Sequence, residues 1–424
     1  VTPAEKCESG VGLVKRRKIY TSIRGGEVMK FYIQMGHGMQ TLCKDLCEAW
    51  QGTTVILSPQ NIYPTDRLPS FAASLRSVNG AVLFDPQLYS PRKYHKNLQK
   101  HTYWPRGGVT SIELGECKDL LTTLAGINTA IESEAFILPS NIISRIDDRW
   151  GKIQGRIASQ ARQVASGQRL LLTVALGKDV LTDDSQVESI TQYADHWDVD
   201  GVYIVCEHPE RHYLIDNPIW LANLLSLVAG IKRLGKEVIV GYANHQMLPL
   251  ALAKCDAIAA GNFLNVRWFQ PEHFETTDND DISQRTKWYY CPQALSEFKV
   301  AYLDVARRTK ILDRLAPPPS MANQYSNVLF GGAIPSSTNY SERNSFMHYL
   351  HCLKIQCENA NRATYVDSRN AHFAQLETAA RILDGLHDER IKGQDRDFRE
   401  IVDVNEAAIQ TFDKEFGFAM AREW

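Results

Sequence analysis

The stretch that decides the fold is residues 199–268, which reads VDGVYIVCEHPERHYLIDNPIWLANLLSLVAGIKRLGKEVIVGYANHQMLPLALAKCDAIAAGNFLNVRW. Three short apolar runs, at 202–206, 238–242 and 257–260, alternate with helix-length amphipathic segments. This alternation is typical of a parallel sheet built from strands and crossover helices. Each run ends at a cluster of polar residues, and the βα loops of a closed parallel barrel converge at such strand ends.

The same rhythm extends toward the N-terminus. Together with helix-patterned segments, the β-type runs predict an α/β fold, a (β/α)8 TIM barrel. An open doubly wound sheet uses the same alternation, but no glycine-rich phosphate loop follows the first run. The eight runs are 30–36, 53–59, 80–86, 134–140, 169–176, 201–207, 237–243 and 255–261.

With 424 residues, the chain is long enough for a barrel and an appended domain. We predict an N-terminal arm at 1–29, which carries the basic run KRRK, and a catalytic barrel at 30–275. Helical periodicity continues at 294–315, 344–360 and 371–386, which predicts a mainly α-helical C-terminal extension at 285–424.

Composition narrows the classes of partner. A formal net charge of -2 gives no global attraction to nucleic acid, so any such surface must be local. Nine cysteines without regular spacing predict reduced thiols and a cytoplasmic location, and no apolar run is long enough for a membrane helix. His348 and Cys352 offer a zinc alternative, but without a CxxC or HExxH spacing we predict no metal and no cofactor.

Two carboxylates stand at predicted strand ends. Asp85 follows the apolar run AVLF, and Glu207 follows VYIVC. Each is expected at the barrel mouth with one side against an apolar wall, where its pKa can be raised or set by neighbours. Two carboxyl groups in one pocket can protonate a leaving group and activate water, as in glycosidic bond cleavage. His208, next to Glu207, is a candidate to assist departure of the leaving group.

Amide, imidazole and phenol groups occupy the other predicted strand ends. Their donor and acceptor edges suit a nucleobase or a sugar better than a phosphate. Taken singly, each is more often a helix cap or a loop hydrogen bond, but together they predict a substrate site. Its members are Gln60, Asn61, Gln87, Tyr89, Asn141, Tyr242, Asn244, His245, Gln246 and Asn262.

Basic and aromatic residues interleave at 89–108, YSPRKYHKNLQKHTYWPRGG. Positive charges neutralise phosphates and flat rings stack on bases, so this mixture suits a single-stranded or distorted nucleic acid. A plain solvated loop is the alternative interpretation. The predicted nucleic-acid-binding residues are Arg92, Lys93, Lys96, Lys100, Tyr103, Trp104 and Arg106, with Arg267 on a phosphate.

The segments GAVLFDPQLYSPR at 80–92 and KEVIVGYANHQMLPLALAKCDAIAAGNFLNVRW at 236–268 resemble tRNA-guanine transglycosylases, and the likeness covers most of 30–270. The resemblance implies a TIM barrel in which Asp85 contacts the base and serves in acid/base chemistry. The family's covalent nucleophile aligns with Ala259, and only a shifted alignment makes Asp256 the nucleophile. The family's zinc-binding cysteine cluster is missing, and Glu207 stands in its base-binding segment.

With these departures, the sequence resembles the DNA-acting branch of the superfamily, whose members insert 7-deazaguanines into DNA or excise modified phage bases. The resemblance implies a DNA N-glycosylase that excises a modified base, from phage DNA in antiviral defence, after flipping it into the barrel mouth. The alternative is a transglycosylase that exchanges a base for a 7-deazaguanine in DNA or tRNA. A hydrolase of free nucleosides or small glycosides, and an inactive nucleic-acid-binding scaffold, also remain open.

Overall fold

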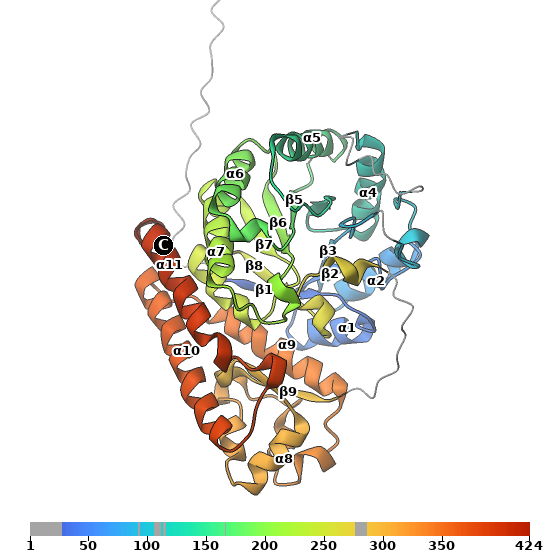
Figure 1. Cartoon of the computed structure of the whole chain (residues 1–424). Coiled ribbons are helices and arrows are strands. Elements are labelled where there is room, and N and C mark those ends of the chain that lie inside the picture. Colours follow the sequence, from blue (N-terminus) through green and yellow to red (C-terminus); the bar gives the residue numbers. More distant parts are fainter. Residues whose placement is uncertain (1–27, 92–93, 106–111, 113–115, 166, 276–285) are drawn as a thin grey trace, which may run out of the picture.

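The computed structural model describes residues 28–91, 94–105, 112, 116–165, 167–275 and 286–424. Nearly all of the predicted N-terminal arm, together with Arg92, Lys93 and Arg106, lies outside these residues. An eight-stranded parallel sheet forms the centre of the molecule (Figure 1). Its strands are β1 Lys30–Gln34, β2 Thr54–Leu57, β3 Ala81–Phe84, β4 Phe136–Leu138, β5 Leu170–Leu176, β6 Gly201–Cys206, β7 Glu237–Val240 and β8 Ala257–Ala260.

The sheet curls into a nearly closed ring, which confirms the predicted (β/α)8 TIM barrel. β1 pairs with both β2 and β8, and the strand order runs from β3 through β1 and β8 to β4. At the seam between β3 and β4, the Glu134 backbone N–H donates to the Val82 carbonyl at 3.0 Å. All seven residues of β5 are buried, because helices cover parallel sheets on the outside.

Crossover helices surround the ring (Figure 1). α7 begins where Pro218 follows Asn217, whose side chain accepts hydrogen bonds from two backbone N–H groups of the first turn. After β7, a 3-10 helix at His245–Ala253 replaces an α-helix and has Pro249 inside it. The crossover α-helices are α1 Gln40–Ala49, α2 Arg67–Arg76, α4 Lys118–Ile131, α5 Asp148–Val164, α6 Asp184–Asp195 and α7 Pro218–Arg233.

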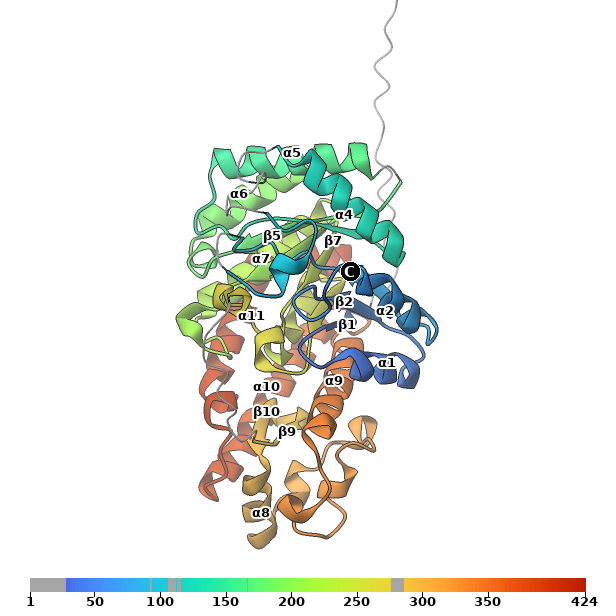
Figure 2. The same cartoon turned by 90° about the vertical axis from the view of Figure 1, so that its right-hand side faces the viewer.

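The C-terminal region is mainly helical, as predicted, but it opens with an antiparallel hairpin that the sequence did not indicate. Its helix α9 contacts β1, α1 and the 3-10 helix after β7, so α9 takes the place of the barrel's eighth helix (Figures 1 and 2). α11 packs along the outside of α7. The elements are β9 Trp288–Cys291, β10 Ser296–Lys299, α8 Val300–Arg308, α9 Glu342–Glu358, α10 Tyr365–Asp388 and α11 Val402–Glu423.

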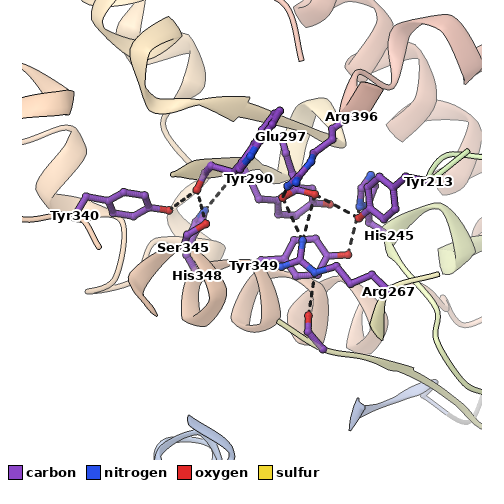
Figure 3. A network of polar contacts seen from close by, with 12 residues as sticks. Tyr213, His245, Arg267, Tyr290, Glu297, Tyr340, Ser345, His348, Tyr349 and Arg396 are labelled. Atoms are coloured by element: carbon purple, nitrogen blue, oxygen red, sulfur yellow. Dashed lines mark hydrogen bonds and ion pairs between the residues drawn. The ribbon is translucent and has the colours of Figure 1, made fainter. Parts of the chain in front are cut away.

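A buried ion cluster joins the barrel to the C-terminal region (Figure 3). The Glu297 carboxylate on β10 bonds Arg267 from the segment after β8 at 3.1 Å and Arg396 at 2.9 Å. The Arg267 guanidinium also lies 3.4 Å from the ring centre of Tyr349 on α9. Burial alone would raise the pKa of Glu297, but Arg396 and Arg267 outweigh burial and lower that pKa to about 2.

Candidate active site

Asp85 lies at the C-terminal end of β3 and is 1% exposed. One carboxylate oxygen accepts hydrogen bonds from the Tyr89 hydroxyl at 2.8 Å and the Tyr242 hydroxyl at 2.9 Å. The other oxygen accepts the Gln87 backbone N–H at 2.9 Å. Residues from the ends of β3 and β7 therefore fix one carboxyl group in a single orientation.

Burial raises the pKa of Asp85 to about 6, although the hydrogen bonds from Gln87, Tyr89, Tyr242 and Tyr203 act in the opposite direction. A carboxyl group with this pKa exchanges its proton close to neutral pH. General acid and base catalysis works best with such a group. Of the predicted catalytic residues, Asp85 is the one whose surroundings fit that role.

Gln87 and Tyr242 connect the carboxyl group to neighbouring strand ends. The Gln87 side-chain amide donates to the Ser58 hydroxyl and to the Tyr242 hydroxyl, both at 3.0 Å. Gln87 has a backbone φ of 54° and Tyr242 one of 52°. Such positive values are uncommon outside glycine and mark strained positions, which concentrate at functional sites.

Tyr203 on β6 completes the interior below Asp85, and the sequence did not single it out. Its hydroxyl donates to the Gln34 side-chain oxygen at 3.1 Å. Any Cβ at position 241 would collide with this hydroxyl, so Gly241 is required for the close approach. Tyr203 belongs to a run of six buried strand residues, so no sequence signal distinguishes it as the inward-facing polar group.

The segment after β8 covers the carboxyl group. Phe269 packs on the ring of Tyr89 at a centroid distance of 4.9 Å, and Phe274 does so at 5.0 Å. Gln60 holds this cover by donating from its side-chain amide to the His273 carbonyl at 2.9 Å. With this cover in place, Asp85 has almost no exposed surface.

Glu207 has surroundings of its own. Its carboxylate accepts the Lys178 backbone N–H at 3.1 Å, beyond the end of β5. Burial raises its pKa, Lys178 lowers it, and Glu272 and Asp179 raise it further. The groups that shift the pKa of Asp85 are instead the tyrosines and Gln87. Each carboxyl group is therefore held by its own set of neighbours, and pairing between the two stays a prediction.

His208 and Asp256 do not join Asp85. Burial lowers the pKa of His208 to about 4, and its Nδ1 lies 3.2 Å from the His212 carbonyl, so this ring is neutral and structural. Asp256 immediately precedes β8 and therefore lies at the opposite end of the barrel. Its carboxylate bonds Lys232 at 2.7 Å and the Val238 backbone N–H at 2.7 Å, beside a cavity of about 720 Å³.

Most of the side-chain amides predicted to bind substrate form hydrogen bonds with other parts of the protein instead. Gln60 and Gln87 belong to the network at the mouth, and Asn61 donates to Ser58 beside it at 3.0 Å. Burial lowers the pKa of His245 to about 4, and His245 lies beside the buried ion cluster that joins the barrel to the C-terminal region (Figure 3). Asn141 donates to the Leu88 carbonyl, Asn244 caps the helix after β7, Gln246 brackets the Ile215 backbone, and Asn262 donates to the His37 carbonyl.

Of the predicted nucleic-acid-binding residues that the structure describes, only the two lysines are exposed. Tyr103 and Trp104 are buried, and Tyr103 donates its hydroxyl to the Pro86 carbonyl at 3.0 Å, so these rings are not free to stack on bases. Arg267 is 2% exposed and neutralised by Glu297, which excludes a phosphate contact. Lys96 and Lys100 are exposed, whereas Arg92, Lys93 and Arg106 lie outside the described residues.

Among the described residues, no group of three or more His, Cys, Asp or Glu side chains is arranged to hold a metal ion. His348 instead contacts the Tyr290 carbonyl at 2.8 Å, and the Cys352 thiol lies 3.6 Å from its Nδ1.

None of the helices within the described ranges combines the length and apolar character needed to cross a membrane.

No family model and no curated protein matches the chain. Solved structures similar to it include 3-dehydroquinate dehydratase from Aquifex aeolicus VF5, with 9% identity over 58% of this chain and 94% of that one, and a TM-score of 0.35. Xylanase 10B from Thermotoga petrophila RKU-1 shares 10% identity over 55% of this chain and 82% of that one, with a TM-score of 0.36. A glucosidase from Croceicoccus marinus shares 11% identity over 62% of this chain and 66% of that one, with a TM-score of 0.35. Likenesses this distant say nothing about what the chain acts on.

The raised pKa of Asp85 predicts a pH-dependent stability. In the unfolded chain an aspartate titrates near 3.9, so the folded protein binds the proton more tightly. The resulting stability is fully present below about pH 3.9 and is lost as pH rises through about 6. We expect the stability of Asp85→Asn relative to the wild type to rise by about 2 kcal/mol from pH 4 to pH 8. Urea denaturation at both pH values measures this difference, and a constant difference would contradict the expectation.

Proposed function

We propose that the protein is a DNA N-glycosylase, which hydrolyses the bond between a modified base and its sugar. The observation that carries this proposal is the buried Asp85 carboxyl group at the C-terminal mouth of the barrel. Its pKa near 6 suits it to protonate a departing base at physiological pH. DNA as the substrate, and a modified phage base in particular, follow from the resemblance to the DNA-acting transglycosylase branch.

The reaction needs one proton and one water molecule. Protonated Asp85 donates its proton to the base nitrogen as the base–sugar bond breaks, and the bonding electrons leave with the base. Water then attacks the anomeric carbon of the sugar cation and returns a proton to Asp85. Glu207, half-buried at the end of β6, is the second carboxyl group near the mouth and the candidate to orient that water.

The positions of Ala259 and Asp256 support hydrolysis over base exchange. Exchange on the transglycosylase pattern needs a carboxylate that holds the sugar covalently while one base leaves and another enters. The aligned position is Ala259, a buried apolar residue of β8, and Asp256 lies at the other end of the barrel. Water attack requires no such carrier.

The cover over Asp85 suits a substrate that arrives as a flipped base. A base entering the mouth would displace Phe269 and Phe274 and take their place against Tyr89 and Tyr242. Lys100 is exposed, with its ammonium 4.1 Å from the ring centre of Tyr63, and is available to a phosphate. A flipped base that excludes water in this way would strengthen the interaction with the buried acid.

The function is tested by incubating the protein with several chemically distinct phage DNAs and with unmodified DNA. Mass spectrometry identifies bases released into solution, and abasic sites are counted on the DNA. We expect release from at least one modified DNA and none from unmodified DNA. A labelled 7-deazaguanine appearing in DNA or tRNA would identify base exchange instead. Release from free nucleosides but from no DNA would identify a nucleoside hydrolase, and retained DNA binding without any product would identify an inactive scaffold.

The tyrosines around Asp85 predict the pH profile of base release. We expect the rate to fall as pH rises through about 6, because the acid form of Asp85 disappears. Tyr242→Phe removes a hydrogen bond that lowers the pKa of Asp85, so the midpoint of this decline moves to higher pH. Tyr103→Phe is the matched control, because its buried hydroxyl donates to the Pro86 carbonyl instead. Equal midpoints in the two variants would contradict the assignment.

A further inference from the structure

Gln34 is the last residue of β1 and is fully buried. Its side-chain oxygen accepts the Tyr203 hydroxyl at 3.1 Å, and because β1 and β6 are not neighbours in the sheet, this bond crosses the interior of the barrel. Branched apolar residues usually fill such an interior, and burying a polar group is costly unless it is hydrogen-bonded. A polar pair at this place therefore indicates a role beyond packing, and the reaction steps above use neither residue.

The Tyr203 hydroxyl has one proton and two acceptors within reach. One acceptor is the Gln34 oxygen, to which Tyr203 donates in the structure. The other is the Asp85 carboxyl group, whose pKa is lowered when Tyr203 donates to it. The hydroxyls of Tyr89 and Tyr242, by contrast, both donate to Asp85. Gln34 and Asp85 therefore compete for the proton of Tyr203.

This competition favours one form of the carboxyl group. When Asp85 is protonated, its own O–H needs an acceptor, and the Tyr203 oxygen provides one while the Tyr203 proton points to Gln34. When Asp85 is ionised, Tyr203 stabilises it by donating to the carboxylate, because a hydrogen bond to a charged group is the stronger one. By holding the Tyr203 proton, Gln34 weakens that stabilisation of the ionised form.

Other tyrosines also lie around Asp85, namely Tyr89, Tyr103 and Tyr242. Burial raises the pKa of each of these, and of Tyr203, well above its usual value. All four therefore keep their protons at the pH where Asp85 titrates. These neighbours influence the acid through hydrogen bonds and not through a change of charge, so the direction of one hydroxyl proton matters.

We propose that Gln34 is a positioning residue that keeps Asp85 in its proton-donating form by holding the hydroxyl proton of Tyr203. Gln34 acts through Tyr203 and does not touch the substrate. The use of this acid against a departing base rests on the N-glycosylase function proposed above. The competition for the Tyr203 proton does not require catalysis, so it is measured separately.

The test compares the wild type with Gln34→Met, which fills a similar space without an amide. NMR titration of protein labelled with ¹³C in its aspartate carboxyl groups gives the pKa of Asp85, whose signal is identified by its absence from Asp85→Asn. Both substitutions at position 34, Gln34→Met and a second variant Gln34→Leu, are also made in a Tyr203→Phe background. Gln154→Met is the matched control, because its amide on α5 is equally buried but donates to the Ser140 hydroxyl at 2.8 Å. Thermal unfolding verifies which variants are folded.

We expect the pKa of Asp85 to fall from about 6 to about 5 in Gln34→Met, the worth of one hydrogen bond. The pH midpoint of base release falls with it, and release at pH 7 becomes about tenfold slower because less Asp85 is protonated. In the Tyr203→Phe background the same substitution has no effect, since the contested proton is gone. Gln154→Met keeps the wild-type pKa and midpoint.

An unchanged or raised pKa in folded Gln34→Met would overturn the assignment. A raised pKa would follow if the Gln34 amide were turned over, with its nitrogen donating to Tyr203. An equal fall with and without the Tyr203 hydroxyl would also overturn it. A lowered pKa without base release from any DNA would refute the glycosylase function alone. Base release by Gln34→Met with the wild-type midpoint would refute the role of Gln34 alone.

Discussion

Asparagine in place of Asp85 is expected to slow base release by about a hundred- to ten-thousandfold, the usual contribution of a general acid. The amide keeps the shape of the carboxyl group and can still meet the hydroxyls of Tyr89 and Tyr242, but it has no proton to donate to the base. Single-turnover release from a modified DNA, measured by mass spectrometry, gives this rate without interference from product dissociation.

The matched control for this variant is Asp397→Asn. Asp397 is also buried and accepts two backbone N–H groups, from Gly393 at 2.7 Å and Arg399 at 3.1 Å, but it lies in the C-terminal region. We expect this control to release base at the wild-type rate. Undiminished release by Asp85→Asn would remove Asp85 from the mechanism, and an equal loss in both variants would show that the loss is not specific to the mouth.

Glu297→Ala is expected to lower the free energy of unfolding by about 3–5 kcal/mol, because it leaves buried arginine charges unpaired. The side chains of Arg267 and Glu297 are each 3% exposed, and that of Arg396 is 14% exposed. The three side chains meet in one network (Figure 3). Guanidinium denaturation at pH 7 measures the change. Glu358→Ala is the control, because its pair with Lys354 on α9 is partly exposed and worth at most about 1 kcal/mol.

The same cluster sets an acid limit on stability. The folded pKa of Glu297 lies near 2, below its unfolded value of about 4.3, so its stabilisation is present above that unfolded value. It is lost as pH falls from about 4.3 through 2. A triple replacement with apolar residues at 267, 297 and 396 should recover most of the stability lost by Glu297→Ala and remove this acid sensitivity. A Glu297→Ala loss below about 1 kcal/mol would contradict a role in holding the two parts together.

The eight strands could be predicted because each strand of a parallel barrel is covered on both sides and reads as a short apolar run. The burial of α7 on nearly all sides could not be predicted. Eleven of its residues are buried, because α11 packs against the side that an amphipathic pattern leaves to solvent. That contact joins segments almost two hundred residues apart, and no local periodicity reports it. The hairpin of β9 and β10 is a local pairing, and it was missed because the prediction of a helical segment at 294–315 was wrong over Ser296–Lys299.

The candidate site shows a similar division. The position of Asp85 at a strand end was predictable from the apolar run before it, but its cover was not, since Phe269 and Phe274 come from the far side of the ring. The prediction that put Asp256 with the catalytic residues rested on the family resemblance alone, and Asp256 immediately precedes β8. A residue that precedes a strand lies at the opposite end from one that follows a strand. Arg267 was assigned to a phosphate because its partner Glu297 comes from another part of the fold.

The position of α9 has a consequence for how the chain is made. Synthesis proceeds from the N-terminus, so the ribosome completes all eight strands more than eighty residues before Glu342–Glu358 emerges. Until then the outer side of β1 lacks the cover that α9 later supplies. A nascent barrel in this state is prone to self-association, and a gene cut after residue 275 should give insoluble protein.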